Sequence, residues 1–390
     1  MNLLTRQIDS QIKSHFKNRR QILLLLGARQ VGKTTLLKRL FPEAQYFLLD
    51  NDPARKNFET YDIHSYRQFI GSQSSKTVII DEIQLLPDPG RAAKIIYDQM
   101  PNVQLIITGS SALNIKNTAS ESLAGRKIDY QLFPLTFSEY LYQTRTEEEL
   151  HDNFLERLVS GKLSPSIHQF DLSATVGRIL TYGLNPYLVQ NPSDSLYLSE
   201  LASSSIYKDI FELNLIENRA VASNLLKLLA YQIGNLINYS ELAAKLGVDA
   251  RTVQRYISIF EQSFILFRLY PFTSKRRDEI GKAPKIYFYD LGLRNAVIED
   301  FSNPFLRRDF GAMFENFVIG EILKHNVYSN AGYKLAFWRT VQGAEVDLVL
   351  HQGEEVIACE IKTAKGRACS AFNNRYPNAK VKLITIDNFY

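Results

Sequence analysis

The chain has 390 residues, which suggests two or three domains, and 45% hydrophobic residues, which is typical of a globular protein with buried cores and excludes a disordered chain. A formal net charge of +5 is too mild to indicate nucleic-acid binding by itself, and two cysteines provide neither a disulfide framework nor a zinc site. The apolar runs are of strand length and the start is polar and basic, so we expect no membrane span, no signal peptide and a cytoplasmic protein.

A glycine-rich loop near the N-terminus joins an expected strand, residues 22–26, to an expected helix, residues 36–40. In such a loop backbone N–H groups bind phosphate, and a lysine reaches the β- and γ-phosphates. We therefore expect Lys33 to act in catalysis and the Thr34 hydroxyl to ligate Mg²⁺. The predicted ATP-binding residues are Gly27, Ala28, Arg29, Gln30, Val31, Gly32, Lys33, Thr34 and Thr35.

A second nucleotide motif follows about fifty residues after the glycine loop. Residues 77–80 are an apolar strand that ends in two carboxylates, Asp81 and Glu82. Phosphoryl transfer needs positioning and charge stabilisation rather than covalent chemistry. Asp81 is expected to orient Mg²⁺ through water, and Glu82 to polarise the attacking water.

The next expected strand, residues 103–107, ends in small polar residues. If this strand lies between the other two, Thr108 or Ser110 faces the γ-phosphate and senses it. The alternative, to which we give equal weight, is that residues 109–111 only cap a helix.

Arg126 precedes a fifth expected strand, residues 128–133. It is either a finger on the nucleotide of a neighbouring subunit, which would require a homo-oligomer, or a surface arginine near a helix end, which carries slightly more weight. Alternation of strands with helices predicts an α/β fold with a parallel sheet.

These motifs resemble those of predicted prokaryotic AAA+ ATPases that carry a C-terminal domain of uncharacterised function. The resemblance implies the AAA+ fold and ATP hydrolysis, and it leaves the physiological task open. It covers nearly the whole chain and is weakest over residues 144–174. The segments that carry it in the first domain are the glycine loop and residues 81–84, 107–111, 123–126 and 133–140.

The middle of the chain begins with a polar linker, residues 160–175. Residues 182–187 form a turn that resembles the family's Gly-Gly-x-Pro turn, with Leu184 in the second position, so the local geometry is expected to differ. Two expected helices, residues 196–211 and 220–237, resemble the helical lid of an AAA+ module.

Residues 238–262 fit a helix-turn-helix. Ser240 is expected to cap the first helix, Gly247 to make the turn and Asp249 to cap the second helix. The apolar stripe of the second helix is expected to face the core. The opposite side, where a recognition helix meets a DNA groove, carries Arg251, Gln254 and Arg255.

Two expected strands, residues 264–270 and 285–289, support a winged version of this motif. The segment between them, residues 274–284, is basic and suits phosphate contacts. Its candidate DNA-binding residues are Lys275, Arg276 and Arg277. The equally weighted alternative is a scaffold that packs on protein, with a solvated basic loop.

The C-terminal third predicts a helix, residues 311–323, and strands 333–339, 343–350 and 356–362. Strict alternation puts Val346, Leu348 and Leu350 on one face of a strand, and Glu345, Asp347 and Val349 on the other.

Alternation also lets Asp347, Glu360 and Lys362 share a face, to which the packed helix adds Glu315. This set is similar to the PD-(D/E)xK nuclease constellation, in which Asp347, Glu360 and an outer Glu315 would hold Mg²⁺, and Lys362 would act on the phosphate. The weightier alternative is an inactive nuclease-like fold held by Glu345–Arg339 and Glu360–Lys362 ion pairs.

The predicted fold is therefore α/β: a P-loop AAA+ parallel sheet with a helical lid, then a winged helix and a C-terminal α/β nuclease-like domain. The expected domains are residues 1–143 (ATPase), 144–232 (lid and linker), 233–295 (winged helix) and 296–390 (nuclease-like).

The leading functional hypothesis is an ATPase with ATP and Mg²⁺ as cofactors, acting as a switch associated with DNA. The second is a signalling ATPase that binds a protein partner through an inactive docking domain and makes no nucleic-acid contact. A third, with less weight, is a DNA endonuclease gated by ATP.

Overall fold

The computed structural model describes residues 4–71, 76–110, 123–146, 150, 154–163, 170–206, 216–272, 283–340, 342–364 and 370–390. The chain divides into two compact units. Unit 1 comprises Met1–Pro134 with Gln262–Phe264, and unit 2 comprises Leu135–Glu261 with Ile265–Tyr390. The division into four domains stays a prediction.

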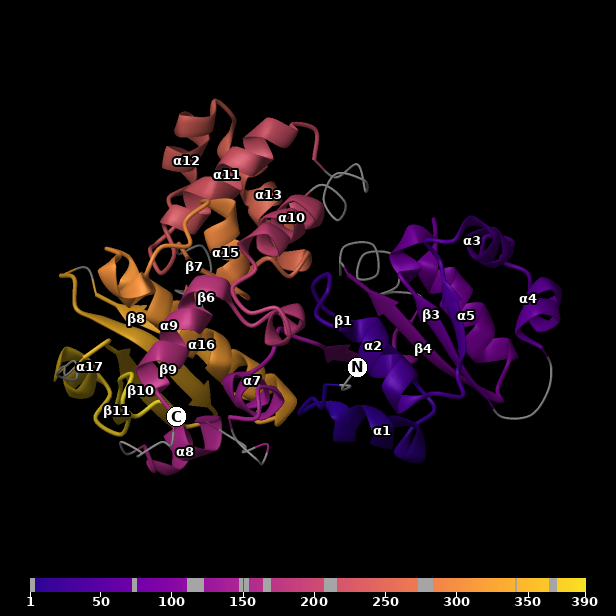
Figure 1. The fold of residues 1–390 in the computed structure, drawn as a ribbon, viewed down its shortest axis with the longest axis horizontal. Helices are drawn as coiled ribbons and strands as arrows, with labels where there is room; N and C mark the ends of the chain where they lie inside the picture. Colours follow the sequence, from indigo (N-terminus) through magenta and orange to yellow (C-terminus); the bar gives the residue numbers. More distant parts are fainter. Residues whose placement is uncertain are drawn as a thin grey trace. The chain divides into compact units, whose positions relative to one another are not determined.

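Unit 1 is a parallel sheet with the strand order β2-β3-β4-β1-β5, accompanied by helices (Figure 1). The inner strand β1 is buried along its whole length, as its unbroken apolar run predicts. The α/β expectation is confirmed, and β4 does lie between β1 and β3. The strands are β1 (Ile22–Leu26), β2 (Gln45–Leu48), β3 (Lys76–Asp81), β4 (Val103–Gly109) and β5 (Lys127–Gln131). The helices are α1 (Asp9–Asn18), α2 (Lys33–Leu40), α3 (Asp52–Phe58), α4 (Ile63–Ile70), η1 (Ile83–Leu85) and α5 (Pro89–Gln99).

Unit 2 contains a mixed sheet with the order β11-β10-β9-β8-β6-β7, together with helices (Figure 1). Strands β6 and β7 pair antiparallel, as expected for the hairpin of a wing, but β6 also pairs with β8. The hairpin and the C-terminal strands therefore share one sheet. The strands are β6 (Leu266–Pro271), β7 (Lys285–Phe288), β8 (Lys334–Arg339), β9 (Glu345–Gln352), β10 (Glu355–Ile361) and β11 (Lys380–Ile384).

The helices of unit 2 begin at side-chain caps in several places, among them Thr136, Asp171, Asn218 and Asp290. They are α7 (Phe137–Gln143), α8 (Phe154–Ser160), α9 (Leu172–Tyr182), η2 (Pro186–Val189), α10 (Ser195–Ile206), α11 (Arg219–Tyr231), α12 (Tyr239–Leu246), α13 (Ala250–Gln262), α15 (Leu291–Val297), η4 (Pro304–Leu306), α16 (Phe310–Tyr328) and α17 (Ser370–Arg375). No helix among the described residues is both long and apolar enough to span a membrane.

Two local expectations in the helical part need correction or refinement. Asn238, not Ser240, caps α12, because its Oδ1 accepts from the Glu241 amide at 3.2 Å and the helix begins two residues earlier than expected, at Tyr239. In the turn after α9 only Gly183 takes a left-handed φ, of 77°. Leu184 in the second position does not take a left-handed φ, so a side chain is tolerated there, and its amide donates to the buried Asp290 carboxylate at 2.7 Å.

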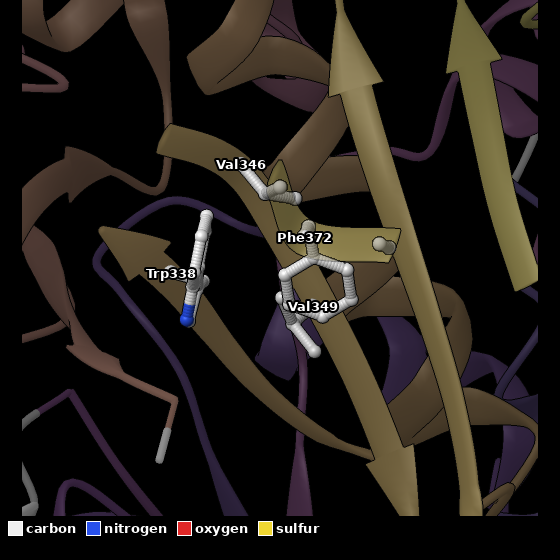
Figure 2. Packing of buried hydrophobic residues seen from close by; sticks show 5 residues of the cluster. Trp338, Val346, Val349 and Phe372 are labelled. Carbon is white, nitrogen blue, oxygen red and sulfur yellow. The ribbon is translucent and has the colours of Figure 1, made fainter. Parts of the chain in front are cut away.

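Strand β9 does not follow the strict alternation that its sequence predicts. Its pairing with β8 shifts between Ala336, which faces Val349, and Trp338, which faces Val346. Three steps on β9 match two on β8, so β9 carries a bulge. Val346 and Val349 consequently pack into one buried cluster with Trp338 and Phe372, instead of lying on opposite faces (Figure 2).

We expect Phe372→Ala to lower the free energy of unfolding of unit 2 by about 3–5 kcal/mol, because the ring is fully buried in this cluster. Trp338 is the only tryptophan and its ring lies 5.1 Å from that of Phe372, so its fluorescence during denaturation reports on this core. The control is Leu306→Ala, at a side chain that is 86% exposed, with an expected change below about 0.5 kcal/mol. Equal losses for the two variants would contradict the assignment of the core.

Candidate nucleotide site and charged face

The glycine loop joins β1 to α2 and is held against the segment that follows β5. A Cβ at Gly27 would lie 2.2 Å from the Leu132 carbonyl oxygen, so only glycine fits there. The Lys33 ammonium is buried and donates to the carbonyl oxygens of Gly27 and Ala28 at 2.8 and 2.9 Å. The Lys33 side chain therefore lies over the glycine loop, which joins β1 to α2.

The Asp81 carboxylate is the centre of a hydrogen-bond network at the end of β3, where it is 2% exposed. Its Oδ2 accepts from the Thr34 hydroxyl at 2.6 Å and from the Tyr46 hydroxyl, while its Oδ1 accepts from Thr108. Burial, with the hydrogen bond to Asp81 as the next cause, raises the pKa of Tyr46, so this phenol stays a neutral donor. Tyr46 was not expected from the sequence, because its role depends on β2 lying beside β3.

Glu82 follows at once, in a left-handed conformation with a φ of 59°. Its Oε2 accepts from the Ser110 hydroxyl at 3.1 Å and from the Gln84 side-chain amide, and that amide also contacts Ser110 at 3.1 Å. Ser110 therefore lies beside the predicted catalytic carboxylate, while Thr108 lies beside Asp81. Gln84 is a further site residue that we did not expect, although it lies within the motif of residues 81–84.

The donor set at the end of β3 suits magnesium. Mg²⁺ prefers hard oxygen ligands, and it commonly takes one or two carboxylates with nucleotide phosphates completing its shell. The Thr34 hydroxyl and the Asp81 carboxylate already lie in contact at the start of α2, next to the loop. These residues fit the predicted cofactor.

Arg126 lies at the amino ends of the parallel strands, whereas the glycine loop lies at their carboxyl ends. It immediately precedes β5, and its carbonyl accepts from the Ile22 amide at the start of β1, whereas the loop follows the end of β1. Its guanidinium makes two hydrogen bonds to Asp98, at 2.9 and 3.3 Å, which raise its pKa. This position is far from the loop of its own chain, and a role toward another subunit stays a prediction.

The structure brings together the C-terminal residues that the sequence pairs. The Lys362 ammonium lies 3.1 Å from Asp347 Oδ2 and 3.2 Å from Glu360 Oε2. The same Asp347 oxygen accepts from the Ile361 amide at 2.8 Å. Both ion pairs of the inactive alternative are also present, since Arg339 lies 3.6 Å from Glu345.

A further lysine, which sequence reasoning did not place here, enters this group from β7. Lys285 is 3% exposed, and its ammonium lies 2.5 Å from Glu345 Oε1 and 3.4 Å from Glu315 Oε1. The Tyr287 hydroxyl donates to the same Glu315 oxygen at 2.6 Å. We call the set Lys285, Glu315, Glu345, Asp347, Glu360 and Lys362 the charged face.

Within the part of the chain that the structure describes, no three His, Cys, Asp or Glu side chains converge as the ligands of a metal ion would. On the charged face, lysine ammoniums lie between the carboxylates instead. The metal roles of Glu315, Asp347 and Glu360 stay predictions.

The second helix of the expected helix-turn-helix, α13, buries its predicted stripe of Val253, Tyr256, Ile257 and Phe260. Arg251, Gln254 and Arg255 are exposed on its other side, and Arg255 lies 3.3 Å from Glu217. Asp249 caps α13 through the Thr252 amide at 2.8 Å, as expected. Lys275, Arg276 and Arg277 lie outside the described residues.

Three family models match the chain in succession. Residues 19–141 match the one described as AAA domain, residues 175–303 match Domain of unknown function (DUF8612), and residues 310–387 match Domain of unknown function (DUF4143). The glycine loop and both carboxylates of the second motif fall within the first match. The AAA-type P-loop ATPase character predicted for this part is thus supported, whereas the other two descriptions name neither a winged helix nor a nuclease.

Related proteins resemble the chain over most of its length. An uncharacterized protein of Methanocaldococcus jannaschii is 26% identical, over 91% of this chain and 78% of the relative. An uncharacterized protein of Mycobacterium tuberculosis is also 26% identical, over 88% of this chain and 71% of the relative. Among solved structures, the Walker-type ATPase of Pyrococcus abyssi is 14% identical, over 76% of this chain and 96% of that one, with a TM-score of 0.47.

We predict that Tyr46 and Asp81 are energetically coupled by about 1–3 kcal/mol, because the hydrogen bond joins a phenol to a buried carboxylate. The measurement is a double-mutant cycle of Tyr46→Phe and Asp81→Asn, in which the free energies of unfolding are compared without nucleotide. If the two losses simply add, Tyr46 does not hold the Asp81 carboxylate.

Proposed function

We propose that the chain is an ATP-hydrolysing switch that acts on DNA through the surface of α13. The single observation that carries the ATPase part is the pair of networks at the end of β3, one around Asp81 and one around Glu82. The first network links the buried Asp81 carboxylate, the proposed Mg²⁺ ligand, to Thr34 at the start of α2. The second holds the carboxylate of Glu82, the proposed catalytic base.

In this proposal each residue of the site has one task. When bound, Mg²⁺ supplies charge neutralisation on the phosphates, and Thr34 and Asp81 would hold it. Lys33 exchanges the carbonyls of Gly27 and Ala28 for phosphate oxygens. Glu82 accepts a proton from the attacking water, and Ser110 orients its carboxylate.

A buried arginine offers a route from the loop toward the end of unit 1. Arg6 is 4% exposed and donates to the Val31 carbonyl in the glycine loop at 3.1 Å. Its other terminal nitrogen donates to the Phe133 carbonyl at 2.7 Å, next to Pro134, where unit 1 ends. A loop that moves on nucleotide binding would therefore pull on the segment that leads into unit 2.

Beyond that segment, the chain is anchored to the long helix α16. Glu321 and Lys324 form a buried ion pair at 2.8 Å, and both also bond the backbone. Glu321 accepts from the Phe137 amide at 2.8 Å, and Lys324 donates to the Leu135 carbonyl at 2.8 Å. The residues that immediately follow Pro134 are therefore hydrogen-bonded, within unit 2, to α16, the helix that also carries Glu315.

We expect Glu82→Gln to lower ATP turnover at least about 100-fold while ATP binding is retained, because the amide keeps the shape of the side chain but cannot take a proton. Turnover is measured by phosphate release and binding by a fluorescent ATP analogue. Lys33→Ala is the matched control and should lose binding as well. Turnover that survives Glu82→Gln would refute the role of this carboxylate.

The DNA part of the proposal rests on charge and exposure on α13. Arg251, Gln254 and Arg255 form one exposed face on a helix whose other side is buried, which is the disposition that a recognition helix needs. Glu217 is the acidic partner with which DNA phosphate would compete for Arg255. The contact is exposed on both sides, so little is lost when it is exchanged.

We expect the double variant Arg251→Ala, Arg255→Ala to weaken duplex binding and to reduce the slope of log K against log salt by roughly 2, because each phosphate contact contributes about 0.9. Lys227→Ala removes an exposed lysine from α11 and is the matched control, with a smaller expected change. Binding is measured by fluorescence anisotropy over a range of salt concentrations. An unchanged slope in the double variant would reject the DNA contact of α13.

A second candidate function is an ATPase whose C-terminal part docks a protein partner without cleaving nucleic acid. The charged face favours it, because its carboxylates already have ammonium partners. A stable protein partner together with a lack of salt-dependent DNA binding would select this candidate over the first.

A further inference from the structure

We propose that Lys285 takes the position of a divalent cation on the charged face, so that this surface does not take up a metal ion. The inference depends neither on ATP hydrolysis nor on DNA binding by α13. Lys285 lies outside the pattern formed by Asp347, Glu360 and Lys362.

The Lys285 ammonium has a defined position between two carboxylates. It lies between Glu315 of α16 and Glu345 of β9, at 3.4 and 2.5 Å, and 5.5 Å from the centre of the Phe337 ring. The side chain is 3% exposed, so water contributes little to its charge balance. A cation of fixed position thus bridges carboxylates from two elements, as a metal ion would.

One oxygen of Glu315 and one of Asp347 each accept hydrogen bonds from two donors. Oε1 of Glu315 is contacted by both Lys285 and the Tyr287 hydroxyl, and Oδ2 of Asp347 by both Lys362 and the Ile361 amide. A divalent ion that bridged these side chains would have to displace such donors. It would also come close to a buried ammonium, where like charges repel strongly in a medium of low dielectric.

Lys285 cannot readily move away from the carboxylates, because its strand is hydrogen-bonded on both sides. Its strand β7 pairs with β6 on one side, and on the other the amides of Gly234 and Ile237 donate to the carbonyls of Ile286 and Pro284 at 3.0 and 2.9 Å. Lys362, by contrast, has a side chain that is 43% exposed and can swing into solvent.

The consequence is a change in what the surface can do. Without a metal ion, no Lewis acid neutralises the phosphate or activates a water there, so the Asp347, Glu360 and Lys362 set lacks the means to hydrolyse a phosphodiester. What remains is a surface on which two lysines, one of them partly exposed, contact four carboxylates.

The test is Mn²⁺ binding to the full-length chain without nucleotide, followed by the loss of the electron paramagnetic resonance signal of free Mn²⁺. We expect Lys285→Met, which keeps the length of the side chain and removes its charge, to bind about one more Mn²⁺ per chain than the wild type. Lys285→Arg keeps the charge and should gain none. Adding Glu315→Gln to Lys285→Met should abolish the gain.

The ATP site is intact in all of these variants, so its contribution cancels and a failed ATPase proposal would not affect the result. Wild type compared with Asp347→Asn gives a second measurement that needs no change at Lys285. Equal Mn²⁺ binding by these two proteins supports the proposal, even if Lys285→Met does not fold. Mn²⁺ binding or metal-dependent DNA cleavage by the wild type that Asp347→Asn abolishes would overturn it, as would a folded Lys285→Met variant that gains no Mn²⁺.

Discussion

The buried carboxylate of Asp81 is the constraint around which unit 1 is organised. A carboxylate that is 2% exposed is costly to bury unless donors reach it, and here three hydroxyl groups do so. Thr34 comes from α2, Tyr46 from β2 and Thr108 from β4, so the network requires β3 to lie between β2 and β4. The strand order and the nucleotide site are therefore two aspects of one arrangement.

The sequence predicted the parts of this site that are contiguous along the chain. The loop of residues 27–35 and the pair Asp81 and Glu82 were identified because strand, loop and helix patterns surround them. Tyr46 could not be identified in this way, since its contact with Asp81 joins residues 35 positions apart across two strands whose adjacency no local pattern encodes. Ser110 was singled out from the sequence, but its contacts with Gln84 and Glu82 became apparent only from the fold.

In unit 2 the sequence predicted which residues meet and two of their ion pairs, but not the contacts of Lys285. Asp347, Glu360 and Lys362 do lie together, although the bulge in β9 breaks the alternation from which their common face was inferred. Alternation assumes a regular strand, and a bulge is a property of the pairing with β8 rather than of β9 alone. Lys285 begins the expected strand that follows the basic segment of the wing, and the sheet that this strand shares with β8 and β9 carries it into the interior beside Glu345.

The two clusters of buried carboxylates differ in the kind of donor that satisfies them, and this difference has a functional meaning. Around Asp81 the donors are neutral hydroxyls, which lower the cost of burial without cancelling the negative charge, so the site keeps an affinity for a cation. Around Glu315 and Glu345 the donors include an ammonium, which offsets part of their negative charge, and removing such a buried partner typically costs about 3–5 kcal/mol. Neutral donors can yield to a metal ion that arrives with a nucleotide, whereas a buried lysine on an anchored strand cannot. On the two proposals made above, the carboxylates at the end of β3 would take up a metal ion with the nucleotide, whereas the charged face would not.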